Sequence, residues 1–108
     1  MAKIRFDHRD KTWELEFDRK SFVNAEKSGF HLEGIIHTPL LQMETLFRIA
    51  LLKNHPSTSE KVLQDLLDAF VEKYGIDDFL NFAVEEYRHF MPTTQPSSTR
   101  EKMTIIND

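Results

Sequence analysis

Cysteine is absent from the 108 residues, and glycine and proline are scarce, with three and four residues. The lack of cysteine excludes disulfides, thiol nucleophiles and cysteine-ligated zinc or iron–sulfur sites. Three scattered glycines cannot form the GxGxxG or phosphate-binding loops of nucleotide enzymes. No apolar run is long enough to cross a bilayer, and the charged, alternating first residues do not form a signal peptide. We therefore expect no membrane partner and a protein that stays inside the cell.

Recognised catalytic and metal-binding patterns are also missing. There is no HExxH, GxSxG or EF-hand spacing in the chain. Only Glu85 and His89 have the i, i+4 spacing that places two ligands on one helix face, a spacing also common on solvated helices. Asp77 and Asp78 stand at a predicted helix start, where free backbone N–H groups favour carboxylates. The sequence therefore predicts a protein that is not an enzyme and has no cofactor or metal.

The charge balance argues against nucleic acid as the main partner. The formal net charge is −4, and residues 60–91 carry three basic side chains against eight acidic ones. Nonspecific affinity for nucleic acid comes from cations that displace the counterions of the phosphate backbone. An acidic chain of this kind is expected to repel that backbone.

Two short stretches at the start of the chain alternate apolar and polar residues with period two. The apolar members are Ile4 and Phe6, and then Trp13, Leu15 and Phe17, with a polar turn between the two stretches. This alternation predicts two half-buried strands. A lone hairpin is marginal in water, so we expect this one, from about Lys3 to Phe17, to pack on helices.

Helical periodicity and end signals predict four helices after the hairpin. The first runs from Arg19 to about Ser28, between an Asp18 N-cap and Gly29, and 31–37 form a connector. The second runs from Pro39 to about Asn54, after a Thr38 N-cap. The third begins at a capping box of Ser57 and Glu60 and ends at Gly75, and the fourth runs from an Asp77 cap to Phe90 or Met91.

The expected fold class is α+β, with an N-terminal two-stranded β-hairpin packed on a bundle of about four α-helices. Residues 1–91 form one predicted domain. Residues 92–108 are predicted to be a flexible tail, because the stretch from Pro92 to Thr99 is poor in apolar residues and rich in turn formers. Apolar residues return only at Met103, Ile105 and Ile106.

The second and fourth predicted helices carry more apolar residues than one buried face requires. On the second helix, Leu41, Ile49 and Leu52 form a stripe separate from the one that contains Phe47 and Leu51. Such an excess predicts a partner surface, either for a second copy or for an amphipathic helix held in a groove. The alternative is that these residues close a helical core against the hairpin. The predicted partner-binding residues are Leu41, Phe47, Ile49, Leu51, Leu52, Phe79, Phe82, Tyr87 and Phe90.

The chain resembles the tail assembly chaperones of long-tailed phages and prophages of Gram-positive bacteria. Three segments carry the resemblance: Ile4 and Phe6 with Trp13 to Lys20, then Glu26 to Phe30, and Leu46-Phe47 with Ala50 to Pro56. The order of the predicted elements agrees as well, over roughly Lys3 to Phe90.

The resemblance implies a chaperone that binds and solubilises the helical tape-measure protein in the cytoplasm of the bacterial host during tail assembly. Members of that family are also made as longer, frameshifted products that recruit the tail-tube protein, which makes that protein a second expected partner. The spare apolar surface further predicts a homo-oligomer. Two alternatives are a structural tail or connector subunit that remains in the virion and a small regulator that binds protein or DNA.

Overall fold

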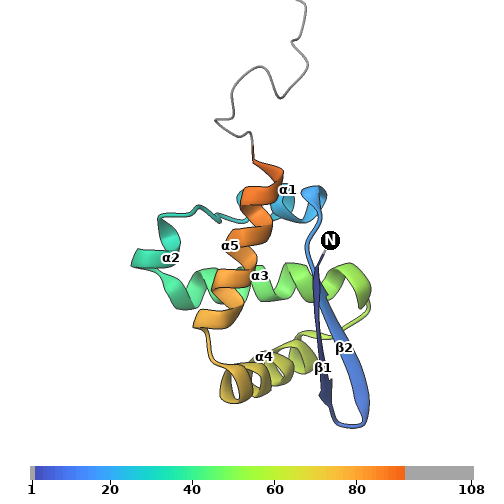
Figure 1. Cartoon of the computed structure of the whole chain (residues 1–108). Helices are drawn as coiled ribbons and strands as arrows, with labels where there is room; N and C mark the ends of the chain where they lie inside the picture. Colours follow the sequence, from blue (N-terminus) through green and yellow to red (C-terminus); the bar gives the residue numbers. More distant parts are fainter. Residues whose placement is uncertain (1, 92–108) are drawn as a thin grey trace, which may run out of the picture.

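The structure is a computed structural model that describes residues 2–91. A hairpin of two strands is followed by five helices (Figure 1). The elements are β1 (Lys3–His8), β2 (Lys11–Glu16), α1 (Arg19–Lys27), α2 (Gly34–His37), α3 (Pro39–Asn54), α4 (Glu60–Tyr74) and α5 (Asp77–Phe90). The α+β class predicted from the sequence is confirmed. The predicted tail, 92–108, lies outside the described residues.

The hairpin closes through a two-residue turn. The strands are antiparallel, and Phe6 pairs with Trp13 across them. Arg9 and Asp10 join them with φ values of +52° and +63°, and two successive positive φ values match the right-handed twist of the flanking strands. The alternation in sequence puts one face of the hairpin against the helices, where Phe6, Trp13 and Leu15 are buried.

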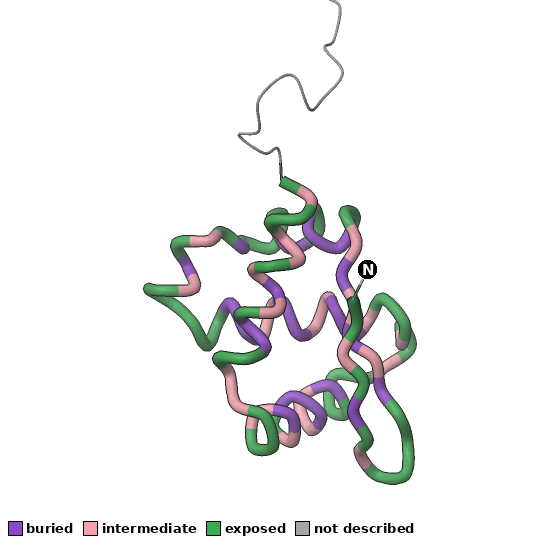
Figure 2. Tube along the Cα trace, in the orientation of Figure 1, coloured by how far each residue is buried: buried purple, intermediate pink, exposed green. Residues whose placement is uncertain are grey.

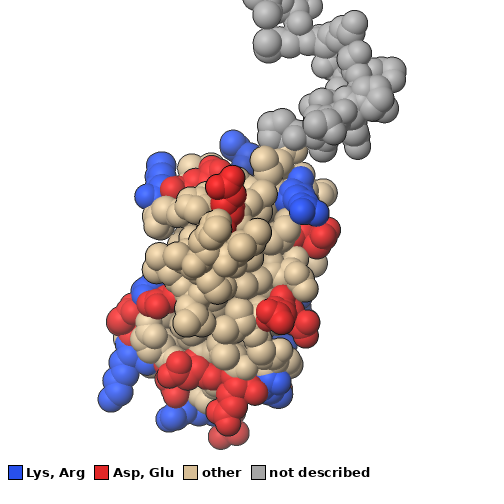
Figure 3. Space-filling view, turned by 90° about the vertical axis from the view of Figure 1, so that its left-hand side faces the viewer, with Lys and Arg blue, Asp and Glu red and all other residues tan. Residues whose placement is uncertain are grey.

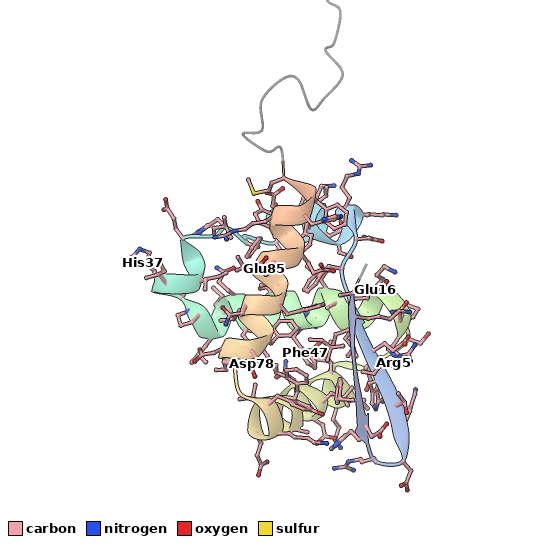
Figure 4. The ribbon with its side chains drawn as sticks, in the orientation of Figure 1. Arg5, Glu16, His37, Phe47, Asp78 and Glu85 are labelled. Atoms are coloured by element: carbon pink, nitrogen blue, oxygen red, sulfur yellow. The ribbon has the colours of Figure 1, made fainter. Side chains whose placement is uncertain are left out.

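Aromatic side chains from four elements meet at the centre of the molecule. The ring of Phe47 on α3 lies 5.6 Å from Phe70 on α4 and 5.9 Å from Phe79 on α5. Phe6 of β1 approaches the same group, 5.3 Å from Phe70. Figure 4 labels Phe47 in this central position, and Figure 2 shows that the purple, buried stretches of the chain face inward around it. The hairpin and the long helices therefore share one core.

The ends of α1 are fixed by two capping arrangements. The Asp18 carboxylate accepts a hydrogen bond from the Ser21 backbone N–H at 2.7 Å, which confirms the predicted N-cap. At the other end, Gly29 has a φ of +101°, and the N–H of Phe30 donates to the carbonyl of Ala25 at 2.9 Å. This pattern is a Schellman motif, and it turns the chain so that Phe30 enters the core.

Three local predictions need correction. The predicted connector contains the short helix α2. Helix α4 is capped by Ser59, whose hydroxyl accepts from the Val62 N–H, rather than by Ser57. Helix α5 has Ile76 at its N-cap and no side-chain cap, so Asp77 is its first helical residue. The errors at α4 and α5 concern only the first turn, whereas α2 is too short to give a periodic signal.

His55, directly after α3, fastens the helical part to the hairpin. Its Nε2 accepts the backbone N–H of Glu14 at 3.0 Å, and its ring lies 4.9 Å from Trp13. Burial lowers the pKa of His55 below 6.5, and the nearby Lys11 ammonium lowers it further. The neutral ring is the form that can accept this hydrogen bond.

Candidate functional site

The most exposed apolar side chains lie together where α2 meets α3. Ile36 is 79% exposed, Leu40 70% and Leu41 61%, more than any other large apolar side chain of the described part of the chain. We call these three residues the apolar corner. Figure 3 looks onto the side of the molecule that carries α2, and a wide central area of this face shows neither basic nor acidic side chains. Charges of both signs lie around its edge.

Helix α2 is held in this place by close packing on α3. Gly34 is buried, and a Cβ atom on it would lie 2.8 Å from Cδ of Gln42. Its backbone N–H donates to Nδ1 of His31 at 2.8 Å, and its carbonyl accepts the Thr38 N–H at 2.7 Å. The missing side chain of Gly34 therefore lets the backbone of α2 approach α3, and Ile36 and His37 are left on the outside, as Figure 4 shows for His37.

A shallow groove continues from the apolar corner along the outer face of α3. It consists of two hollows of about 210 and 380 Å³ that share Arg48 and Ile49. Leu41 lines the first hollow and Leu52 the second, while Ser28 and Asn24 of the α1 region line the opposite side. We call this the α3 groove. The separate apolar stripe predicted on this helix thus lies along one continuous surface feature.

Of the three basic residues that line the α3 groove, Arg48 and Lys53 are paired with carboxylates, and the third is Lys20. Arg48 donates from both terminal nitrogens to Glu60, one of them at 2.6 Å, and Lys53 lies 3.1 Å from Glu16. The hydrogen bond from Arg48, with one from Gln64, lowers the pKa of Glu60 to about 2. Hydrogen bonds from Asn54 and Lys53 hold the pKa of Glu16 below its usual value. Paired cations of this kind attract a phosphate backbone weakly, so the groove fits an apolar ligand better than a nucleic acid.

Three of the predicted partner-binding residues belong to the core. Phe47, Leu51 and Phe79 are each 0% exposed. Their assignment to a binding surface is therefore corrected, because they have no surface for a partner to contact. They close the helical core, which is the alternative that the sequence left open for them.

The remaining predicted residues do not form a single groove between α3 and α5. Phe82 is half-buried, 6.1 Å from the ring of Phe17. Tyr87 and Phe90 line a separate cleft between α1 and α5. Residues of α1 line both this cleft and the α3 groove, so α1 lies between the cleft and the groove. Of the predicted residues, only Leu41, Ile49 and Leu52 lie together in the α3 groove.

Sequence reasoning misses Ile36 and Leu40. It places Ile36 in a connector and groups Leu40 with the stripe of the second helix that contains Phe47 and Leu51, without including it among the binding residues. The sequence signal that could have found them is the density of large apolar residues between Ile35 and Leu41, at a helix start where few other elements can cover them.

The described residues contain neither a cluster of metal ligands nor a membrane-spanning helix. No three His, Asp or Glu side chains of residues 2–91 lie close enough together to hold a metal ion. None of the helices in that part of the chain is both long and apolar enough to span a bilayer.

The sequence matches one family model, described as a domain of unknown function (DUF5055), over residues 1–103. No curated protein and no solved structure matches the chain. Because the match covers far more than half of the chain, the protein belongs to the DUF5055 family.

Proposed function

We propose that this protein is a tail assembly chaperone that binds an apolar helical segment of a phage tape-measure protein. The binding surface is the α3 groove together with the apolar corner. The observation that carries the proposal is the exposed apolar corner, which continues into a groove lined by Leu41 and by the half-buried Ile49 and Leu52, because contiguous accessible apolar surface marks a site of interaction. The resemblance to tail assembly chaperones supplies the identity of the client.

The shape of the surface favours a helix as the ligand. Leu41, Ile49 and Leu52 recur on one face of α3, so the apolar positions of a second helix can pack between them at i, i+3, i+4 and i+7. The paired charges of Arg48 and Lys53 border this apolar line and present polar groups to the flanks of the client. A net charge of −4 then helps to keep the complex in solution while the apolar face of the client is covered.

A second copy of the chain could cover the same surface, and the homo-oligomer expected from the sequence stays a prediction. Binding of the tail-tube protein stays a prediction as well. A virion subunit and a small regulator are the alternative functions. Light scattering over a wide concentration range distinguishes self-association from client binding, because only self-association raises the mass of the isolated chain.

The proposal is tested by co-expression with a phage tape-measure protein as the client. We expect wild type to keep the client soluble and to co-purify with it. The double variant Leu41→Ser with Leu52→Ser should lose both effects. Val62→Ser is the matched control, because Val62 is 40% exposed on α4, outside the α3 groove, and this variant should behave as wild type.

Two outcomes contradict the proposal. If the client stays insoluble although the wild-type protein is folded and abundant, the chaperone function is contradicted. The virion subunit and the regulator then become the favoured functions. Client binding that survives in the double variant leaves the function but moves the binding surface away from the α3 groove.

A further inference from the structure

The cleft between α1 and the last turn of α5 is a preformed apolar recess. It has a volume of about 190 Å³. The ring of Phe22 lies 5.1 Å from Tyr87 and 6.0 Å from Phe90, and these three rings form its floor. Val23 and Met91 line its sides and are each 39% exposed. The side chains of Val23 and Met91 thus remain partly exposed in a cleft whose aromatic rings already pack on one another.

A polar contact keeps this cleft in shape. The hydroxyl of Tyr87 donates to the Glu26 carboxylate at 2.7 Å, and this hydrogen bond raises the pKa of Tyr87 to about 12. This hydrogen bond connects α1 to α5 across the cleft. The two helices are therefore already in place before a ligand binds. A ligand that meets a rigid recess loses less free energy to ordering than one that must form it.

The chain itself supplies an apolar segment within reach. Met91 lines the cleft, and the chain continues from it into residues 92–108. Residues 92–102 contain no large apolar side chain, and Met103, Ile105 and Ile106 follow directly. The mean end-to-end distance of a flexible linker of this length is about 20 Å. Because residues 92–102 start at the cleft, the local concentration of the apolar segment there is on the order of millimolar.

Charges at the edge of the cleft complement those next to the segment. Arg19 and Glu26 line the cleft. Arg100, Glu101 and Lys102 immediately precede Met103 and bring charges of both signs. We propose that the segment Met103–Ile106 of this same chain docks in the α1–α5 cleft, with its apolar side chains against Val23 and Met91.

The absence of cysteine allows a direct test by crosslinking. The full chain is made with the pair Val23→Cys and Ile105→Cys, and disulfide formation under mild oxidation is followed by mass spectrometry and non-reducing gels. The matched control pairs Ile105→Cys with Val62→Cys, because Val62 has nearly the same exposure as Val23 but lies on α4. We expect the intramolecular disulfide to form at least about ten times faster in the first pair.

Equal rates in the two pairs overturn the proposal. A disulfide between two chains at the Val23 pair overturns it as well, because it makes a second copy the occupant of the cleft.

A second measurement needs no crosslink. In the double variant Ile105→Ser with Ile106→Ser, the amide resonances of Val23, Tyr87 and Phe90 should shift from their wild-type positions, while those of α4 stay unchanged. Wild-type positions at all three residues overturn the proposal. Neither experiment involves the client, so a negative result here leaves the proposed chaperone function standing.

Discussion

The two faces of α3 are made of similar side chains and have opposite surroundings. On the inner face, Leu46, Phe47 and Leu51 are completely buried. On the outer face, Leu41 is 61% exposed, and Ile49 and Leu52 are half-buried at the edge of the core. The two faces lie on one helix and share its backbone, so differences in secondary structure cannot account for the contrast.

The contrast shows that burial, and not residue type, decides what an apolar residue contributes. An inner-face leucine stabilises the fold because its whole surface is removed from water, at about 25 cal/mol per Å². Leu41 on the outer face is mostly exposed, so most of that free energy is not gained in the isolated chain. It becomes available only when a partner covers this side chain, which makes Leu41 suitable for binding and nearly dispensable for folding.

The largest expected effect is at the centre of the inner face. Phe47→Ala removes a ring that contacts the rings of Phe6, Phe70 and Phe79, so it loses the transfer free energy and leaves a cavity. We expect a loss of about 3–5 kcal/mol in the free energy of unfolding, measured by urea denaturation. A loss below about 1 kcal/mol would show that the inner face is not the main source of stability.

An intermediate effect is expected where α2 covers the first turn of α3. Gly34→Ala forces its new methyl group against Gln42, which is 3% exposed and has little room to move. Overpacking costs about 1–3 kcal/mol, and the better helix propensity of alanine returns about 1 kcal/mol, so we expect a net loss of up to about 2 kcal/mol.

The matched control for Gly34→Ala is Ile36→Ala on the same short helix, with an expected change within about 0.5 kcal/mol, since Ile36 is largely exposed. Urea denaturation of both variants checks the pair. A larger loss for Ile36→Ala than for Gly34→Ala would reverse our interpretation of which side of α2 is packed.

A smaller effect, which depends on pH, is expected at the C-terminal end of α3. Burial lowers the folded-state pKa of His55, so between that value and 6.5 the unfolded chain binds more protons than the folded one. The contribution of His55 is therefore fully present above pH 6.5 and is lost as the pH falls through the folded-state pKa. Urea midpoints at pH 7.5, 6.5 and 5.5 should decrease in that order.

The variant His55→Gln isolates this contribution. Glutamine keeps an acceptor for the Glu14 N–H but does not titrate in this range. Its urea midpoint should change less with pH than that of wild type. Identical pH profiles for the two proteins would assign the dependence to other groups.

The smallest effect on stability is expected on the outer face. Leu41→Ser removes a side chain that is mostly in water, so the free energy of unfolding should change by no more than about 0.5 kcal/mol. In the same variant, retention of the client on an affinity resin should fall clearly below wild type. A variant that loses stability instead would show that the outer face is part of the fold and would remove the contrast with the inner face.

The order of elements could be predicted from the sequence because its local signals agree with one another. Helix α3 begins at Pro39 and ends at Asn54 as expected, and the Asp18 cap and Gly29 bound α1 as expected. Helix α2 escapes prediction because one turn is too short to show a period. The cap of α4 is misplaced because Ser57 and Ser59 both precede the apolar run, and Ser57 lies inside a turn in which Thr58 donates to the His55 carbonyl.

The candidate site could be predicted only in part. Periodicity separates the two stripes of α3 but does not tell which of them is covered, so it groups Phe47 and Leu51 with Leu41 and Ile49 as binding residues. It is the position of the hairpin and of α4 and α5 that buries the first two. Leu40 is 70% exposed. The spacing of residues within α3 does not predict this exposure, because it does not give the position of α2.

Trp13 has a consequence for how unfolding can be observed. It is the single tryptophan of the chain, 8% exposed, with the Lys11 ammonium 4.1 Å from its ring and His55 on another side. Its fluorescence therefore reports the separation of the hairpin from the end of α3, whereas circular dichroism reports the helices. Coincident transitions from the two signals would mean that strands and helices unfold as one cooperative unit. An earlier fluorescence transition would mean that the hairpin detaches from a helical part that is still folded.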